Sequence, residues 1–163
     1  MIYMGFRVGE VLLLEVDSIH LEEGYIIGGE KTEAGKDRTV PFPESIPEIK
    51  QFVENWVRKA APGGKLFSMT YQTFRVTHYY APLMELGIVD GYIENGKTVF
   101  NTPHHITPHS TRHTFATLSA EAGMKPKELQ KIIGHAKIQT TLDIYTHTNA
   151  DALQSEMNKL TRA

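Results

Sequence analysis

Prolines and glycines divide the last third of this 163-residue chain into three short helical stretches, and this division limits the fold more than any other feature. Pro108 begins the first stretch and Gly123 ends it, while Pro126 begins the second and Gly134 ends it. The third stretch carries Tyr145. We therefore expect three consecutive helices in this part of the chain.

The opening segment, MIYMGFRVGEVLLLEVD, places apolar side chains at helical spacing, and we expect one helix that ends at Asp17. The chain opens inside this apolar pattern, without the polar residue that usually caps a helix. We therefore expect the chain to be an N-terminally truncated piece of a longer protein.

Short β-prone runs follow, separated by Glu-Glu-Gly and Ala-Gly-Lys-Asp turns. They cover residues 19–21, 25–27 and 38–42, and they predict a small three-stranded antiparallel sheet. A second helix is expected after Ser45, because the spacing from Ser45 to Glu48 is that of a capping box.

Three further elements are expected in the rest of the chain. A helix is predicted over about residues 71–86. In the segment YIENGKTVF, residues 92–100, an Asn-Gly pair between β-prone flanks predicts a hairpin, which we interpret as an insertion. Residues 150–162 place Leu153, Met157 and Leu160 on one stripe and predict a C-terminal amphipathic helix.

Composition limits the class of protein. With 40% hydrophobic residues and no linker or repeat, residues 1–163 are expected to form a single domain, mainly α with a small three-stranded antiparallel β-sheet (α+β). The absence of Cys excludes disulfides and thiolate metal sites. No apolar run suits a membrane span and no signal peptide is evident, so we expect a soluble, cytoplasmic protein. Because the net charge is −2, a nucleic-acid function would depend on where the basic residues lie.

Two arginines stand out against this background. Arg7 lies in the apolar N-terminal segment with Glu10 three residues later, and Arg112 closes the run His-Ser-Thr-Arg. Each arginine alone is most simply a surface or salt-bridged residue, because a buried charge without a partner is costly. Together with a hairpin lysine, a Gly-His pair and Tyr145, however, they form a set that suits phosphoryl transfer.

The chemistry explains why these residue types belong together. Guanidinium groups match the non-bridging oxygens of a phosphodiester in bidentate geometry, so two arginines can clamp the charge that develops during in-line attack. A tyrosine hydroxyl is a poor nucleophile at its ordinary pKa, and it needs a neighbouring base or a positive field. Tyr145 also has a simpler interpretation, because it shares a helical face with Ile138 and Leu142 and its ring could pack in the core.

Four segments resemble, in the same order, the catalytic blocks of the tyrosine recombinases, or phage integrases, of phages and conjugative transposons. They read MGFRVGEVLLLEVDSI, EKTEAGKDRTVPF, ITPHSTRHTFATLSAEAG and LQKIIGHAKIQTTLDIYTH. The resemblance extends from Arg7 to His147, and four ordered blocks are more specific than any one of them. It implies the tyrosine recombinase catalytic-domain fold and the cleavage and rejoining of DNA through a 3′-phosphotyrosyl intermediate.

The resemblance also implies a role for each matched residue. Tyr145 would attack the DNA phosphate and release a 5′-hydroxyl, while Arg7 and Arg112 would hold that phosphate. His109 would share in proton transfer or phosphate contact, and His135 would donate a hydrogen bond to a non-bridging oxygen.

Two further residues follow from the same comparison of motifs. Lys31 would be the general acid for the departing 5′-oxygen, and Lys36, which flanks the same Thr-Glu-Ala-Gly turn, stays an alternative. Glu10 matches the acidic position after the first arginine, where it would support the site without transferring a proton.

Neither a metal nor a cofactor is expected. His109 and His113 have the spacing of a zinc-binding helix, but Ser110 stands where such a site needs its Glu base, and Arg112 would repel a cation. The protein–DNA ester of the family keeps the bond energy, so rejoining needs no nucleotide. The chain contains no Gly-rich phosphate-binding loop.

The partner implied by the resemblance is double-stranded DNA, with no membrane and no small-molecule substrate. A tetramer on synapsed DNA would form through exchange of the C-terminal helix, residues 150–162. Two alternatives stay open from the sequence. One is a topoisomerase-like DNA cleaver with the same chemistry, and the other is a catalytically inactive DNA-binding module of the same fold.

Overall fold

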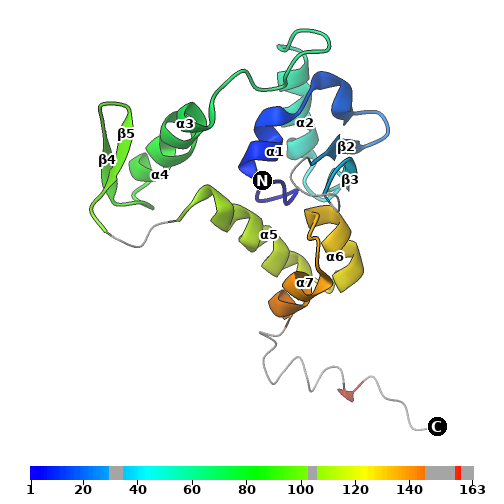
Figure 1. The fold of residues 1–163 in the computed structure, drawn as a ribbon. Helices are drawn as coiled ribbons and strands as arrows, with labels where there is room; N and C mark the ends of the chain where they lie inside the picture. The colour runs from blue at the N-terminus through cyan, green and yellow to red at the C-terminus, as the bar shows by residue number, and fades with distance from the viewer. Residues whose placement is uncertain (30–34, 103–105, 146–156, 159–163) are drawn as a thin grey trace, which may run out of the picture.

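The computed structural model describes residues 1–29, 35–102, 106–145 and 157–158, and this part of the chain is mainly helical (Figure 1). The helical elements are α1 (Val8–Leu13), η1 (Val16–Ser18), α2 (Pro47–Val57), α3 (Tyr71–Thr73), η2 (Phe74–Tyr80), α4 (Ala81–Glu85), α5 (Pro108–Glu121), α6 (Pro126–Ile133) and α7 (Ile138–Tyr145). The strands are β1 (Ile19–His20), β2 (Tyr25–Gly28), β3 (Arg38–Pro41), β4 (Gly91–Glu94) and β5 (Lys97–Phe100). The predicted fold class, mainly α with a small three-stranded antiparallel sheet, is confirmed.

The sheet has the order β1-β2-β3, and both pairs are antiparallel, with Ile26 opposite Val40. Side chains alternate along β3, so that Arg38 and Val40 are buried while Thr39 is exposed. Gly29 accepts a backbone hydrogen bond from Asp37 at the open end of the β2–β3 pair. This end of the sheet lies beside α6 (Figure 1).

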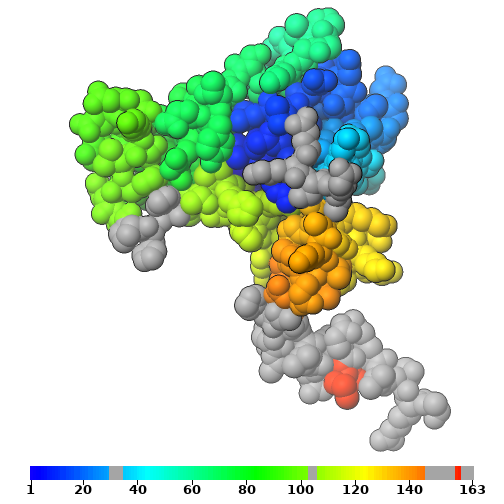
Figure 2. Space-filling model, in the orientation of Figure 1, coloured from blue at the N-terminus to red at the C-terminus, as the bar shows by residue number. Residues whose placement is uncertain are grey.

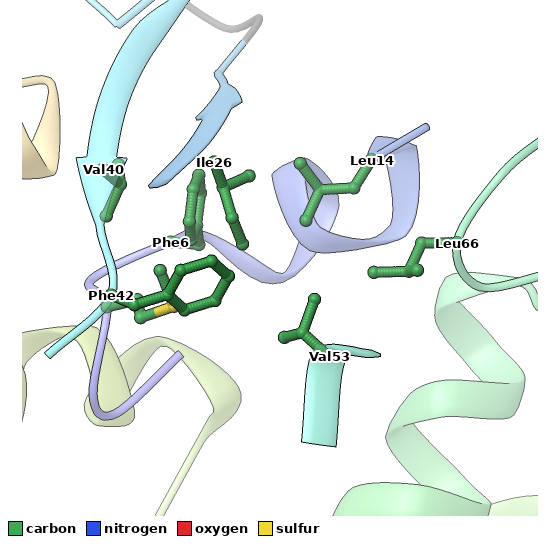
Figure 3. Packing of buried hydrophobic residues seen from close by; sticks show 8 residues of the cluster. Phe6, Leu14, Ile26, Val40, Phe42, Val53 and Leu66 are labelled. Atoms are coloured by element: carbon green, nitrogen blue, oxygen red, sulfur yellow. The ribbon is translucent and has the colours of Figure 1, made fainter. Parts of the chain in front are cut away.

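The first hydrophobic cluster fills the space between this sheet, α1 and α2, as Figure 3 shows. Ile26 and Val40 enter it from the strands, and Val53 enters it from α2. All three side chains are nearly or fully buried. The remaining buried members are Met4, Phe6, Leu14, Phe42 and Leu66. The cluster thus fixes the segment that leads into α1 against the sheet.

The prediction of one helix over the first seventeen residues is wrong. The structure has turns up to Gly5, a helix only from Val8, and the separate one-turn helix η1 near Asp17. Gly5 has a φ of 65° and lies so close to Phe115 that a Cβ would come within 2.6 Å of its ring. An α-helix cannot pass through that backbone conformation, so the apolar residues before it pack as a turn.

The capping box expected from Ser45 is also absent. The helix α2 begins at Pro47, its N-cap residue is Ile46, and no side chain caps it. Proline at the first position of a helix lacks the N–H that would otherwise need a partner, so the helix can begin without a polar cap.

The helices α3, η2 and α4 follow one another without a break, and the β4–β5 hairpin packs beside them. Asn95 and Gly96, with φ of 48° and 70°, form the turn between the two strands. The fully buried ring of Tyr80 contacts the ring of Phe100 edge-on at 4.9 Å. Figure 2 shows this part of the chain as a green lobe on one side of the molecule.

The C-terminal helices α5 and α6 begin and end close to where the sequence predicts, and the predicted third helix, α7, carries Tyr145. Gly134 ends α6 in the left-handed conformation, with a φ of 64°. A second hydrophobic cluster, built on Ala116, Leu129 and Ile133, joins the three helices. The C-terminal helix predicted over residues 150–162 lies, apart from residues 157 and 158, outside the described residues. In the described part of the chain, no helix combines the length and apolarity required to cross a membrane.

Candidate active site

The site begins at Arg7, the residue that directly precedes α1. Arg7 has an extended backbone as the N-cap of this short helix, and it lies directly before the turn that presents Glu10. The Glu10 carboxylate accepts the Arg7 backbone N–H at 2.7 Å and the Arg7 guanidinium at 2.7 Å. The Arg7 side chain keeps 22% of its surface exposed. Its guanidinium is therefore held by Glu10 at one nitrogen, and part of the side chain stays accessible to solvent.

Three arginines from distant segments converge on the carboxylate of Glu10. Besides Arg7, the Arg38 guanidinium of β3 donates to both Glu10 oxygens, at 3.0 Å and 2.6 Å. Arg112 of α5 brings a guanidinium nitrogen to 3.9 Å from the same carboxylate. Burial raises the pKa of the Glu10 carboxyl, but the hydrogen bonds from Arg38 and Arg7 outweigh this effect and hold the pKa below its ordinary value. Glu10 is therefore a buried anion.

Arg112 is fixed by main-chain contacts at the base of the site. Its guanidinium donates to the carbonyl oxygens of Gly5 and Ile133, and the residue is 3% exposed. Burial and repulsion from Arg7 lower the pKa of Arg112 to about 10, so it stays charged at neutral pH. Three guanidinium groups thus face one carboxylate, and the site carries an excess of positive charge.

A cleft of about 550 Å³ opens above these groups. The lining residues include both predicted phosphate-binding arginines and His109, and they are Arg7, Val8, Gly9, Glu10, Leu13, Tyr71, Pro108, His109 and Arg112. Because positive charge is in excess and partly buried here, the cleft favours an anionic ligand with several oxygen acceptors.

His135 lies next to this charge cluster, directly after Gly134. Burial is the main reason that the pKa of His135 falls to about 4, and repulsion from Arg112 and Arg7 adds to it. The ring nitrogen Nδ1 lies 3.1 Å from the buried hydroxyl of Thr141, which fixes the ring. A neutral imidazole at pH 7 can donate a hydrogen bond to an oxyanion without adding to the repulsion among the arginines.

His109 is exposed on the first turn of α5, at the rim of the cleft. Its ring meets the ring of His113, one turn later, edge-on at 4.7 Å. Thr107 caps this helix end, with its backbone N–H bonded to the Ser110 hydroxyl at 3.1 Å. The helix start therefore aims His109 and Arg112 at the same space.

The structure does not bring the hydroxyl of Tyr145 into the cleft. Instead this hydroxyl donates to the carbonyl oxygen of Met124, just beyond the last turn of α5. Arg112 lies in the second turn of α5, so about 13 Å of helix separates it from Glu121 at the other end. The Tyr145 ring packs against the second hydrophobic cluster, and burial raises the pKa of its hydroxyl. The structure thus shows the packing of the Tyr145 ring, and the chemical role of its hydroxyl stays a prediction.

Of the two lysines considered as general acid, Lys31 lies outside the described residues. Lys36 is described and exposed, in the turn before β3.

Sequence reasoning missed Arg38. The alternation of side chains along β3 could have revealed it. Arg38 lies two and four residues before Val40 and Phe42, so its side chain is on the same face of the sheet as theirs and points to the core. An inward-facing arginine needs an acidic partner, which Glu10 supplies. Tyr71, half-exposed in the cleft wall at the start of α3, was also missed, and no sequence pattern marks it.

The fold and the cleft together define an α+β domain with a cleft lined by two arginines. Residues 1–152 match the model of the phage integrase family. The chain belongs to this family, which is that of the tyrosine recombinases.

The similar proteins agree with this assignment. The chain is 36% identical over 146 residues to the transposase from transposon Tn916 of Enterococcus faecalis, covering 86% of this chain and 35% of the relative. It is 34% identical over 155 residues to tyrosine recombinase XerA of Saccharolobus solfataricus, covering 95% of this chain and 46% of the relative. The chain therefore spans only a third to a half of the length of these relatives.

Solved structures show the same fold. The Tn1549 transposon integrase in complex with transposon right-end DNA superposes with a TM-score of 0.73 at 26% identity, covering 98% of this chain and 56% of that chain. The XerA recombinase crystal structure superposes with a TM-score of 0.65 at 26% identity, covering 98% of this chain and 56% of the other.

Proposed function

We propose that this chain is the catalytic domain of a site-specific DNA recombinase, which cleaves and rejoins DNA through a 3′-phosphotyrosyl intermediate. One observation carries the proposal: three guanidinium groups surround a single buried carboxylate beside a cleft of about 550 Å³. This arrangement needs an anion, and a phosphodiester offers two non-bridging oxygens to Arg7 and Arg112. The Tn1549 integrase in the superposed structure binds DNA, which supports double-stranded DNA as the ligand.

In the proposed reaction, the hydroxyl oxygen of Tyr145 attacks phosphorus while the bond from phosphorus to the 5′-oxygen breaks. The hydroxyl proton leaves to a neighbouring base, a role that His109 can take, and a general acid, Lys31 or Lys36, protonates the 5′-oxygen. Arg7, Arg112 and neutral His135 stabilise the charge on the non-bridging oxygens. Rejoining reverses each step with a 5′-hydroxyl as nucleophile, so the phosphate bond is conserved.

Because Tyr145 bonds to Met124 in the present structure, the cleaving state requires a different position of this tyrosine relative to α5. We propose that DNA binding releases α7 from this contact. We also propose a cytoplasmic tetramer on two synapsed duplexes, formed by exchange of residues 150–162. The apolar spacing of Leu153, Met157 and Leu160 in the sequence supports that exchange.

The proposal is tested with nicked suicide duplexes drawn from a randomised pool and incubated with the chain or its Tyr145→Phe variant. A protein–DNA adduct that withstands SDS in the parent and is absent in Tyr145→Phe is the expected result. Loss of the adduct with unchanged duplex affinity would assign the hydroxyl to chemistry. A parent chain that binds DNA and forms no adduct, also when supplied with the N-terminal region of a relative, would overturn the proposal in favour of an inactive DNA-binding module.

A further inference from the structure

Arg38 is more completely bonded than either arginine of the cleft. Its guanidinium donates to both Glu10 oxygens, to the Gly35 carbonyl at 3.1 Å and, through Nε, to the Ile132 carbonyl at 2.7 Å. An arginine has five N–H donors, and these contacts occupy four of them. Arg38 is 7% exposed and is not among the described residues that line the cleft. It therefore has little capacity to bind a substrate itself.

The partners of Arg38 are the groups that hold the two cleft arginines. Its bidentate contact fixes the carboxylate of Glu10, and this carboxylate fixes both the backbone and the side chain of Arg7. Arg38 also donates to the carbonyl of Ile132, and the carbonyl of the next residue, Ile133, accepts from Arg112. These two carbonyls belong to the last turn of α6, where backbone acceptors have no helical partner. Arg38 thus connects the anchor of Arg7 to the anchor of Arg112.

Two glycines leave the space that this guanidinium occupies. A Cβ at Gly29 would lie 2.1 Å from the Arg38 guanidinium, and a Cβ at Gly134 would lie 3.2 Å from Arg38 Cδ. The φ values of Gly29 and Gly134 are 105° and 64°, which larger side chains adopt at a cost. The backbone on both sides is therefore shaped around Arg38, as expected for a fixed component of the site.

We infer that Arg38 is a positioning residue for strand cleavage, which acts through Glu10 and the end of α6 to hold Arg7 and Arg112 at the spacing of one phosphate. This inference rests on the proposed function. A displacement of a reacting group by about 1 Å can cost about 100-fold in rate. Loss of the two hydrogen bonds from the Arg38 guanidinium to Glu10 should therefore slow cleavage without removing the cleft.

The test compares Arg38→Lys with Arg58→Lys in the full chain. Arg58 pairs with Glu54 on the exposed surface of α2, so it provides the same substitution beside the same kind of partner, away from the cleft. A lysine keeps the charge at position 38 but offers no planar fork. At saturating suicide duplex, adduct formation is expected to fall about 10- to 100-fold in Arg38→Lys, with duplex affinity within threefold of the parent. Arg58→Lys is expected to react like the parent.

A double-mutant cycle with Glu10→Gln separates positioning from general destabilisation. If Arg38 acts through Glu10, most of the Arg38→Lys effect on the adduct rate disappears in the Glu10→Gln background. Rates are compared at a temperature where circular dichroism shows every variant folded. A folded Arg38→Lys variant within threefold of the parent rate, or effects that multiply fully in the double variant, would overturn the inference.

Orthovanadate, a phosphate-shaped anion, separates failure of this inference from failure of the proposed function. If the parent forms no Tyr145-dependent adduct, the recombinase proposal fails, and calorimetric binding of orthovanadate still reports on the cleft. Tenfold weaker binding by Arg38→Lys than by the parent and Arg58→Lys would support the positioning role. Equal orthovanadate binding by all three proteins would contradict it.

Discussion

Arg7 and Arg112 line the same cleft but differ in how the fold holds them. Arg7 is accessible and has one side-chain contact to Glu10, whereas Arg112 is buried and bonded to the carbonyls of Gly5 and Ile133. One arginine can therefore adjust to a ligand, while the other is part of the interior that joins α5 to α6 and the N-terminal turn. The same substitution should have different effects at the two positions.

We expect Arg112→Lys to lower the free energy of unfolding by about 1–3 kcal/mol, because an ammonium lacks the planar fork with which the guanidinium bonds to both buried carbonyls. We expect Arg7→Lys to lower it by about 1 kcal/mol or less, because the lysine keeps a positive charge beside Glu10 and Arg38 still donates to both oxygens of this carboxylate. Urea unfolding at pH 7 measures both values. Both variants should lose adduct formation, and equal stability of the two would contradict the assignment of Arg112 to the interior.

His135 should make stability depend on pH. Its folded pKa of about 4 lies below the ordinary value of 6.5, so between these limits the unfolded chain binds a proton that the folded chain does not. The stabilisation is complete above about pH 6.5 and is lost as the pH falls towards 4, by an amount on the order of 1–3 kcal/mol. Glu10, whose carboxyl pKa lies below its ordinary value of 4.5, contributes stability that is present above pH 4.5 and is lost at lower pH.

The measurement for His135 is urea unfolding of the parent and of His135→Asn at pH 7, 6 and 5. The parent should lose stability across this range, and the difference between the two proteins should shrink as the pH falls. A difference that stays constant with pH would show that His135 is not held neutral by its surroundings.

At the scale of elements, α7 both packs against the core and carries the proposed nucleophile, Tyr145. Its last two residues, Ile144 and Tyr145, pack against the second hydrophobic cluster, and the Tyr145 hydroxyl bonds to the end of α5. The contacts that hold α7 in place therefore also keep the tyrosine out of the cleft. Weakening them should change stability and cleavage in opposite directions.

We expect Ile144→Ala to lower the free energy of unfolding by about 2 kcal/mol, because it removes a partly buried side chain from the cluster. Adduct formation at saturating duplex should become faster, since α7 leaves its docked position more readily. Leu118→Ala, on the exposed side of α5, is the control. A cleavage rate that falls in Ile144→Ala, at a temperature where the protein is folded, would contradict the docked-state interpretation.

The elements show which signals in the sequence determine structure. Proline and glycine residues predicted the limits of α5 and α6 well, because these residues act through local backbone geometry. The N-terminal helix was overpredicted, since the conformation of Gly5 is required by the close approach of Phe115, more than a hundred residues later. The bond from Tyr145 to Met124 could not be predicted either, because it depends on how α7 packs across α5. Local signals thus reveal the elements, and the assembled structure reveals the site.

At the scale of the whole molecule, two hydrophobic clusters lie on either side of the charged site. The first contains Phe6, Ile26 and Val53, and the second contains Leu129 and Ile133. The Glu10 network connects them, since its arginines come from β3, from the start of α1 and from α5. The site is therefore also a joint between the two halves of the core.

We expect Glu10→Gln to weaken this joint. The single tryptophan, Trp56, packs against the first cluster, so its fluorescence reports on that half. In the parent, the fluorescence and far-ultraviolet circular dichroism transitions in urea should coincide, as in two-state unfolding. In Glu10→Gln, they should separate, and overall stability should fall by about 3 kcal/mol. Glu54→Gln, in the exposed pair, should keep one transition, and coincident transitions in Glu10→Gln would contradict the role of the network as a joint.

The contact between Arg112 and the carbonyl of Gly5 links residues 107 positions apart. On the ribosome, Arg7 and Glu10 are made long before α5 and α6, so the growing chain has no partner for them in the second half of the site. The cleft can form only when translation of this domain is nearly finished. Nascent chains that end before α5 should therefore lack Arg112 and with it one wall of the cleft.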